Sequence, residues 1–377
     1  MSTDALKIER SEEAPRAASD PAIDQRILEI KDFCVDYGVG EKSVRAVDDV
    51  ELHLDRSKVL GIAGESGSGK STLVYAVTRL LRAPAVITGG SAMFNVGPSV
   101  EGGDDEFIDL VTADEAALRR VRWTNVSVVL QSALNAMNPV VRVVKLFDQV
   151  LKAHRRDMSR AHRRARAVEL LALVGLSEDR LQRYAHELSG GQRQRVMIAL
   201  ALALDPQLVI MDEPTTALDV VTQREILNEL SELRARFGFA MIFITHDLSL
   251  LVELADEIVV MYAGRLVERA QGRALYHSPR HPYTLGLLNS FPPMHGAHHE
   301  LTGIPGSPPD LSNLPSGCAF HLRCPYAMER CVTQRPPLVA LGNEGRAVAC
   351  WLHESGKDVV VPVELRRAAP SSKTLAS

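Results

Sequence analysis

The segment GESGSGKS, at residues 64–71, constrains the fold of this chain more than any other stretch. It has the pattern G-x-x-x-x-G-K-S of a phosphate-binding loop, or P-loop. The apolar run at 59–63 predicts a buried strand before it, and a helix is predicted after it at 70–81. Glycines let backbone N–H groups surround phosphate oxygens at a helix N-terminus, where negative charge is favoured. The alternative, a glycine-rich turn with a chance lysine, lacks this strand–loop–helix context.

We expect the loop to bind a nucleotide, with Lys70 reaching the outer phosphates and the Ser71 hydroxyl holding Mg²⁺. The loop residues predicted to contact the nucleotide are Gly64, Ser66, Gly67, Gly69, Lys70, Ser71 and Thr72.

Length and composition place the chain among soluble globular proteins. Its 377 residues are long for one compact core, so about two domains are expected. The formal net charge of −4 gives no global attraction to nucleic acid or anionic lipid. The arginine-rich stretch at 155–166 is interpreted as a solvated helical face, because no aromatic residues are interleaved as in a nucleic-acid site.

No apolar run approaches the roughly 18–20 residues that span a bilayer. The polar first residues lack the apolar core of a signal peptide. We therefore expect a cytoplasmic chain whose membrane role, if it has one, comes through partners.

Beyond the P-loop, apolar strands alternate with helices, which predicts an α/β domain with a mainly parallel sheet. The predicted strands are 126–130, 208–211, 240–245, 257–262 and 265–269, and the predicted helices include 192–204 and 221–237. Gln131, Asp212 and His246 follow three of these strands. Because ligands bind at the carboxyl ends of parallel strands, all three side chains are expected near the P-loop phosphates.

Asp212 and Glu213 are the candidate acidic pair of the site. Asp212 follows four apolar residues and is predicted to hold Mg²⁺, while Glu213 is predicted to polarise an attacking water. An exposed acidic pair that opens a turn before Pro214 is the alternative.

The string LSGGQ at 188–192 is the most discriminating motif of the chain. Its serine hydroxyl and glycine N–H groups at a helix start form a second anion site. Together with the P-loop and Asp212, it makes the chain resemble the ATP-binding-cassette (ABC) ATPases. The resemblance implies that a dimer binds two ATP molecules between its subunits. Four signature residues would then contact the γ-phosphate of the ATP held by the opposite subunit: Ser189, Gly190, Gly191 and Gln192.

The same resemblance assigns further residues in the family's order. Gln131 is similar to the Q-loop glutamine, which senses Mg²⁺ and connects to the transmembrane partner. The segment 217–219 resembles the D-loop at the dimer interface, and His246 resembles the switch histidine that contacts the γ-phosphate. Tyr37 is similar to the aromatic residue that stacks on adenine; the alternative for Tyr37 is a core position.

Three more segments narrow the resemblance to the ATP-binding subunits of dipeptide, oligopeptide and nickel importers: LNAMNPV at 134–140, EPTTALDV at 213–220 and HPYT at 281–284. Such a subunit would couple ATP hydrolysis to the uptake of peptides, with nickel or another small solute as the alternative cargo. The partners implied are a second, related ATPase subunit, two transmembrane permease subunits and an extracytoplasmic substrate-binding protein, with no nucleic acid. The implied location is peripheral, at the cytoplasmic face of the cell (inner) membrane.

Four of the five cysteines lie near the C-terminus, in the spacing C-x₅-C-x₆-C-x₁₈-C: Cys318, Cys324, Cys331 and Cys350. In a reducing compartment such clustering indicates a metal rather than disulfides. The importer resemblance implies a [4Fe–4S] cluster with a structural role. Zn²⁺ and free buried thiols remain alternatives, and zinc is less favoured because the paired C-x₂-C of zinc ribbons is absent. Cys34, within a strand pattern, is expected in the core.

The expected architecture is a P-loop ABC ATPase core with an antiparallel β subdomain, a helical subdomain and a small Cys/Pro-rich C-terminal lobe. The predicted boundaries are a disordered tail at 1–26, the nucleotide-binding domain at 27–290 with its helical subdomain at about 132–187, the cysteine-containing lobe at 291–355 and a flexible tail at 356–377. The stretch 97–105 is expected to be an inserted exposed loop.

Other classes fit less well. Cassette ATPases of DNA repair and chromosome structure interrupt the core with long coiled coils, but only about 120 residues without sustained heptads separate the P-loop from LSGGQ here. Translation-type relatives carry two cassettes per chain, and this chain has one. A metal-binding regulatory module would leave the ATPase motifs unexplained.

Overall fold

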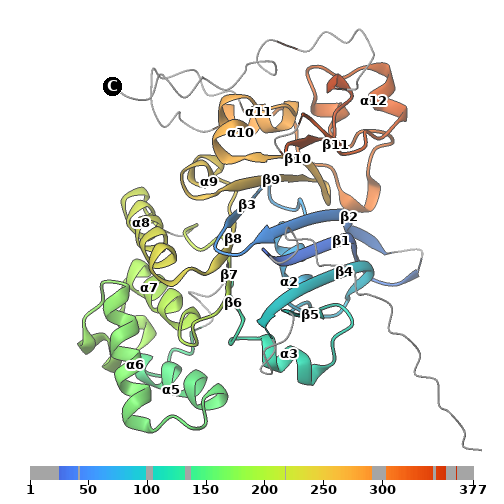
Figure 1. Ribbon diagram of the computed structural model, residues 1–377. Helices are drawn as coiled ribbons and strands as arrows, with labels where there is room; N and C mark the ends of the chain where they lie inside the picture. The colour runs from blue at the N-terminus through green and yellow to red at the C-terminus, as the bar shows by residue number, and fades with distance from the viewer. Residues whose placement is uncertain are drawn as a thin grey trace, which may run out of the picture.

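A computed structural model describes residues 25–40, 43–98, 105–131, 137–216, 218–290, 303–342, 345–353 and 362. Two sheets organise these residues, with helices around them (Figure 1). Within this part of the chain, no helix is both long enough and apolar enough to cross a membrane.

The larger sheet has the strand order β11-β12-β10-β9-β3-β8-β7-β6. Its strands are β3 (Val59–Ala63), β6 (Val126–Val129), β7 (Leu208–Asp212), β8 (Ala240–Ile244), β9 (Glu257–Tyr262), β10 (Arg265–Gln271), β11 (Val339–Ala340) and β12 (Ala347–Val348). The pairs from β9 to β6 are parallel, and β10, β12 and β11 continue the sheet antiparallel. Every residue of β3, β7 and β8 is buried, as expected for parallel strands covered on both faces. The predicted α/β core is therefore confirmed.

The smaller sheet is antiparallel, with the order β2-β1-β4-β5. Its strands are β1 (Arg26–Tyr37), β2 (Val44–Asp55), β4 (Ala85–Pro98) and β5 (Asp105–Asp109). One face of this sheet packs in a single hydrophobic cluster with β3 and the following helix. Cys34, expected in the core, is only half-buried in β1, and its Sγ accepts a hydrogen bond from the Asp49 backbone N–H at 3.4 Å.

The α-helices are α2 (Lys70–Val77), α3 (Glu115–Val121), α5 (Val143–His154), α6 (Arg160–Leu173), α7 (Gly190–Ala201), α8 (Val220–Phe237), α9 (Leu248–Leu254), α10 (Gly272–His277), α11 (Pro282–Asn289) and α12 (Glu329–Thr333). Helices α5 to α7 lie together at one end of the molecule, away from the small sheet (Figure 1). Helix α2 ends before the predicted residue 81, because Arg79 takes a left-handed conformation with φ of 56°.

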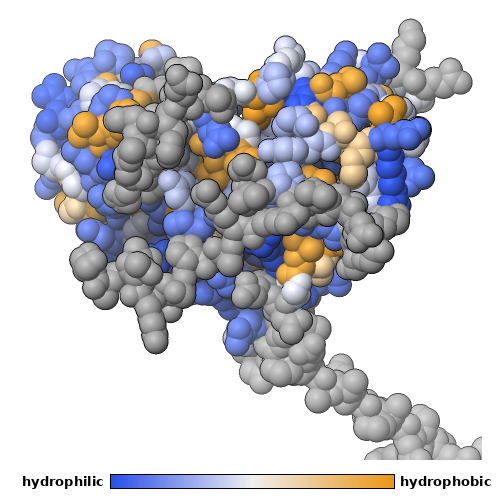
Figure 2. All heavy atoms as spheres, turned by 90° about the horizontal axis from the view of Figure 1, so that it is seen from above, coloured by the Kyte–Doolittle hydropathy of each residue, from blue (hydrophilic) through white to orange (hydrophobic). Residues whose placement is uncertain are grey.

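The C-terminal segment 303–353, in its described residues, packs on the larger sheet. Strand β12 pairs with β10, and the Ala349 backbone N–H donates to the Val267 carbonyl at 2.8 Å. Phe320 joins the hydrophobic cluster that also contains Tyr262 and Tyr283. Seen from above, the described residues of this end carry interspersed hydrophilic and hydrophobic side chains (Figure 2).

Some predictions fall on positions outside the described residues. These are the tail segment 1–24, most of the loop 97–105, positions 134–136 of the LNAMNPV segment, Ala217 of the D-loop, the domain boundary near 291 and all of the C-terminal tail except 362.

Candidate nucleotide-binding site

The loop between β3 and α2 has backbone conformations that favour glycine. Gly64 and Gly69 have φ of 147° and 99°. A Cβ on Gly64 would lie 2.3 Å from the Met261 carbonyl oxygen, and one on Gly69 would lie 2.5 Å from that of Ala46. Helix α2 begins with Gly69 as its N-cap and no side-chain cap, so its first N–H groups remain available to an anion.

Lys70 is buried and spans the loop from inside. Its Nζ donates to the carbonyl oxygens of Gly64 at 2.7 Å and Glu65 at 2.8 Å. Burial lowers the pKa of Lys70, while the carboxylates of Glu213, Asp212 and Glu65 oppose that shift. The loop backbone therefore holds the ammonium group at the start of α2.

Asp212 ends β7 and is fully buried. Its Oδ1 accepts from the Ser71 hydroxyl at 3.0 Å, and its Oδ2 accepts from the Tyr75 hydroxyl at 2.7 Å. Burial raises the pKa of Asp212, and the two hydrogen bonds oppose that shift. Tyr75 was not predicted as a site residue. Its spacing from Ser71 would have found it, because residues four apart share one face of a helix.

Glu213 follows β7 and lies close to side chains that follow the two neighbouring strands, β6 and β8. Its Oε2 accepts from Gln131 Nε2 at 2.8 Å and from the Thr216 hydroxyl at 3.0 Å. The Nδ1 of His246, which is half exposed, lies 3.7 Å from Glu213 Oε1. Glu213 has φ of 45°, an uncommon conformation for a residue with a side chain, and such strain clusters at functional sites. The fold thus brings Gln131, Glu213 and His246 together.

A cavity of about 460 Å³ lies beside these groups. Its lining residues are Tyr37, Val44, Ala46, Ser66, Gly67, Gly69, Lys70, Ser71, Thr72, Gln131, Glu213 and Leu311. The Tyr37 hydroxyl is 3.3 Å from Thr72 Oγ1. The cavity has the size usual for small-molecule sites, and its lining includes one aromatic ring and charged side chains.

The LSGGQ residues do not line this cavity. Ser189 caps α7: its Oγ accepts from the Gln192 backbone N–H, and Gln192 Oε1 accepts from the Ser189 backbone N–H, each at 3.2 Å. This is a capping box. A Cβ on Gly191 would lie 2.8 Å from Thr222 Cγ2 of α8, so the two helices approach closely there. Within one chain, the structure keeps Ser189 to Gln192 apart from the P-loop cavity.

The four C-terminal cysteines converge from separate segments. Cys318, Cys324, Cys331 and Cys350 line one cavity of about 10 Å³. Burial raises the pKa of Cys324 to about 11 and that of Cys350 to about 12. Among the described residues, no three His, Cys, Asp or Glu side chains are arranged to hold a metal ion.

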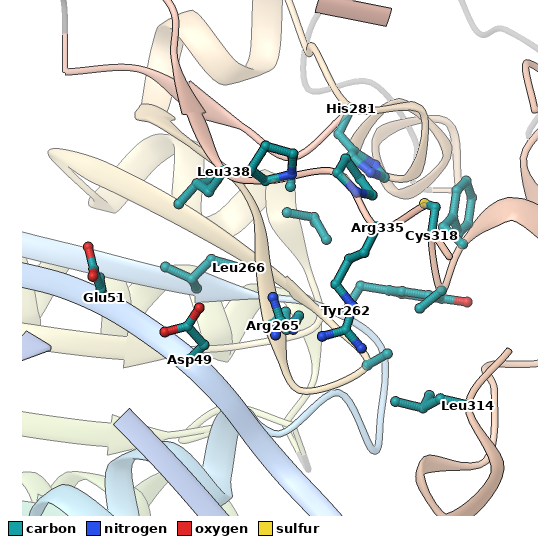
Figure 3. A pocket seen from close by; sticks show the side chains of 17 residues that line it. Asp49, Glu51, Tyr262, Arg265, Leu266, His281, Leu314, Cys318, Arg335 and Leu338 are labelled. Atoms are coloured by element: carbon teal, nitrogen blue, oxygen red, sulfur yellow. The ribbon is translucent and has the colours of Figure 1, made fainter. Parts of the chain in front are cut away.

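Another cavity, of about 440 Å³, lies between β2, β10 and the C-terminal segment. Asp49 and Glu51 lie on its β2 side, and His281 and Cys318 lie on the opposite side (Figure 3). Arg335 also lines this cavity (Figure 3).

Comparison with known proteins gives two family matches: ABC transporter over residues 47–216, and the C-terminal region of oligopeptide/dipeptide transporters over residues 267–331. The chain is 40% identical over 347 residues to the oligopeptide transport ATP-binding protein OppD of Bacillus subtilis (strain 168), covering 91% of this chain and 93% of that protein. It is also 40% identical over 332 residues to the dipeptide transport ATP-binding protein DppD of Caldanaerobacter subterraneus subsp. tengcongensis, covering 88% and 98%.

Solved structures are similar as well. One is a dimeric structure of the ATP-binding cassette MJ0796 in a post-hydrolysis state bound to ADP and Pi. Its TM-score to this chain is 0.55 at 28% identity, over 65% of this chain and 98% of that one.

Proposed function

Because the chain belongs to the family of ATP-binding proteins of oligopeptide and dipeptide ABC transporters, we propose that it hydrolyses ATP to drive peptide uptake across a membrane. The observation that best supports this function is that five side chains come together at one edge of the parallel sheet: Lys70, Ser71, Asp212, Glu213 and Gln131. Peptides are preferred over nickel or another small solute, because the family matches name oligopeptides and dipeptides.

The loop N–H groups and Lys70 bind the phosphates, and Tyr37 stacks on the adenine ring. The Ser71 hydroxyl and the Asp212 carboxylate, 3.0 Å apart, are hard oxygen ligands that suit Mg²⁺, with Gln131 nearby. When bound, Mg²⁺ would neutralise charge on the transferring phosphoryl group.

Glu213 orients a water molecule in line with the γ-phosphorus and accepts its proton. The bond between the water oxygen and phosphorus forms as the bond from phosphorus to the β–γ bridging oxygen breaks, and ADP leaves with that electron pair. Gln131 holds the Glu213 carboxylate from one side. His246 donates a hydrogen bond to a γ-phosphate oxygen from the other side.

This site is one half of a shared site. Ser189, Gly190, Gly191 and Gln192 lie outside the cavity of their own chain, and we propose that they bind the ATP of a second, related ATPase subunit. The dimeric form of the similar solved cassette supports this arrangement. The pair would act with two transmembrane permease subunits and an extracytoplasmic substrate-binding protein, and it would lie peripherally at the cytoplasmic face of the membrane.

The Glu213→Gln variant tests the catalytic assignment in the assembled complex. Removing the base should lower ATP turnover by about 10²- to 10⁴-fold, because an amide cannot accept the proton, while MgATP binding is retained. Glu169→Gln, an exposed carboxylate on α6, is the control and should keep full turnover. Turnover near that of the wild type in Glu213→Gln would refute the assigned role.

We further propose that the four C-terminal cysteines bind a [4Fe–4S] cluster with a structural role. The four thiols around one cavity are the usual ligand set for it. Zinc is less favoured because the chain lacks the paired C-x₂-C spacing of zinc ribbons. Binding of a cluster would require the four cysteine side chains to move apart, because a cavity of 10 Å³ has room for about one water molecule.

Anaerobic purification followed by iron and sulfide analysis tests the cluster. We expect iron and sulfide in the wild-type chain and their loss in Cys324→Ser, with Cys34→Ser as the unaffected control. Wild-type protein that contains only zinc would favour the alternative, and protein without iron, sulfide or zinc would exclude both.

A further inference from the structure

A buried arginine of the C-terminal segment contacts the P-loop directly. Arg323 is 7% exposed and lies immediately before Cys324. Its Nη1 donates to Glu65 Oε2 at 2.7 Å, and its Nη2 donates to Glu65 Oε1 at 2.9 Å. This is the bidentate geometry of the strongest arginine–carboxylate pairs. Glu65 is the second residue of the GESGSGKS loop.

Glu65 is also one of the two backbone acceptors, with Gly64, that hold the phosphate-binding lysine. Its carbonyl oxygen accepts from Lys70 Nζ at 2.8 Å, and its backbone N–H donates to the Tyr283 hydroxyl at 2.7 Å. The side chain and both backbone polar groups of Glu65 are thus occupied. A shift of Glu65 would move an acceptor of the Lys70 ammonium group.

Arg323 itself has little freedom to move. Its Nε donates to the Pro305 carbonyl at 2.8 Å, and its Nη1 also donates to the Tyr262 hydroxyl at 3.3 Å. The guanidinium carbon lies 5.9 Å from the ring centroids of both Tyr262 and Phe320. Hydrogen bonding to Glu65 raises the pKa of Arg323 further, so the guanidinium is a permanent cation there.

We propose that Arg323 is a positioning residue for ATP binding in its own chain: it fixes Glu65, and Glu65 fixes Lys70 for the phosphates. This inference rests on the nucleotide site proposed above for residues 64–72. It also assigns a function to the cysteine-bearing segment. Cys318 and Cys324 flank the turn that carries Arg323. A change in the conformation of this segment would therefore move Arg323 and, with it, Glu65 of the P-loop.

The test measures binding of MgATP, with a fluorescent ATP analogue as the probe, to the full-length chain. Arg323→Gln is expected to weaken the affinity by about tenfold, a typical coupling between two sites. Arg323→Lys should recover part of the loss, because it keeps the charge but not the fork geometry. In the assembled complex, the KM for ATP should rise while kcat at saturating ATP stays close to that of the wild type.

A double-mutant cycle with Glu65→Gln identifies the partner. The double variant Glu65→Gln with Arg323→Gln should bind ATP about as weakly as either single variant, because one interaction is removed in all three. Additive losses would overturn the proposed connection through Glu65.

Arg335→Gln is the matched control from the same segment. Arg335 pairs with Asp48 at 3.1 Å instead of with the P-loop. Thermal unfolding of each variant, recorded in parallel, separates lost stability from lost affinity. An equal loss of affinity in Arg335→Gln and Arg323→Gln would overturn the inference, and so would unchanged affinity in Arg323→Gln.

Two further outcomes stay distinguishable. If the wild-type chain does not bind the analogue at all, the proposed ATP site fails. If wild-type protein binds but Arg323→Gln does not fold, the milder Arg323→Lys and Glu65→Gln variants decide: wild-type affinity and KM in both would overturn the positioning role.

Discussion

The Asp48 carboxylate pairs with three arginines, one each from β2, β10 and the C-terminal segment. Its Oδ2 accepts from Arg265 Nε at 2.7 Å and from Arg335 Nη1 at 3.1 Å, and its Oδ1 lies 3.4 Å from Arg45 Nη1. Burial alone would raise the pKa of Asp48, but the hydrogen bond from Arg265 and the three arginine charges lower it overall. The folded state therefore favours the ionised carboxylate.

The sign of this shift predicts a pH dependence for Asp48→Asn. The carboxylate stabilises the fold above its unfolded pKa of about 3.9, and this stabilisation is lost as the pH falls through the lower folded value. Asp48→Asn should thus reduce the free energy of unfolding by about 1 kcal/mol at pH 7, and by less below about pH 4. Urea unfolding at several pH values measures this, with Glu51→Gln as the control. A difference from the wild type that grows on acidification would contradict the prediction.

At the scale of elements, the start of α7 lies close to the start of α8 because Gly191 has no side chain. Asp219 caps α8 by accepting from the Thr222 backbone N–H at 3.0 Å, and Ser189 caps α7. Both caps hold their helix starts at the contact between Gly191 and Thr222. One glycine and two caps thus lie at the contact between the two helix starts, and Arg195 of α7 pairs with Glu225 and Glu229 of α8 further along.

Gly191→Ala should destabilise the chain by about 1–3 kcal/mol, because the added methyl would lie 2.8 Å from Thr222 Cγ2. Adding Thr222→Ser removes that methyl group but keeps the hydroxyl that donates to Asp219 Oδ2 at 2.7 Å. The double variant should recover the lost stability, since alanine also favours a helix over glycine. Denaturant unfolding without nucleotide checks this; no recovery in the double variant would show that Thr222 is not the cause.

At the scale of the whole molecule, the C-terminal segment shares a sheet and a core with the ATPase fold. Val348 in β12 is fully buried, and Phe320 packs 5.3 Å, between ring centroids, from both Tyr262 and Tyr283. Arg323 adds the ion pair with Glu65. The segment and the sheet are therefore expected to unfold as one cooperative unit.

A Trp123→Phe variant tests this, because it leaves Trp351 in the C-terminal segment as the chain's one tryptophan. The Trp351 fluorescence and the far-UV circular dichroism should then change at the same urea concentration. A fluorescence transition at clearly lower urea would mean that the segment unfolds by itself.

Patterns of apolar and polar residues along the sequence predicted those strands and helices whose formation depends mainly on neighbouring residues. The P-loop strand, the strands near 208–211 and 240–245 and the helix ending at Phe237 follow from apolar runs and their breaks. In β1 (Arg26–Tyr37), apolar and polar residues alternate regularly only at 28–31, because irregular pairing between Ile30 and Phe33 disrupts the alternation beyond them. Helices α3 and α9 were not predicted, because each has only 7 residues and is too short to show a sustained helical pattern of apolar residues.

The P-loop at the start of a helix and the three polar residues that follow neighbouring strands could be predicted from the sequence, because a motif and a strand period are local in the chain. Three features could be seen only in the folded chain: the hydrogen bond from Tyr75 to Asp212, the position of Ser189 outside its own chain's cavity and the ion pair of Arg323 with Glu65. Those contacts join residues far apart in the sequence, and their geometry depends on how sheets and helices pack. The P-loop motif can thus be recognised from eight consecutive residues, whereas Arg323, which pairs with its Glu65, lies 258 positions further along the chain.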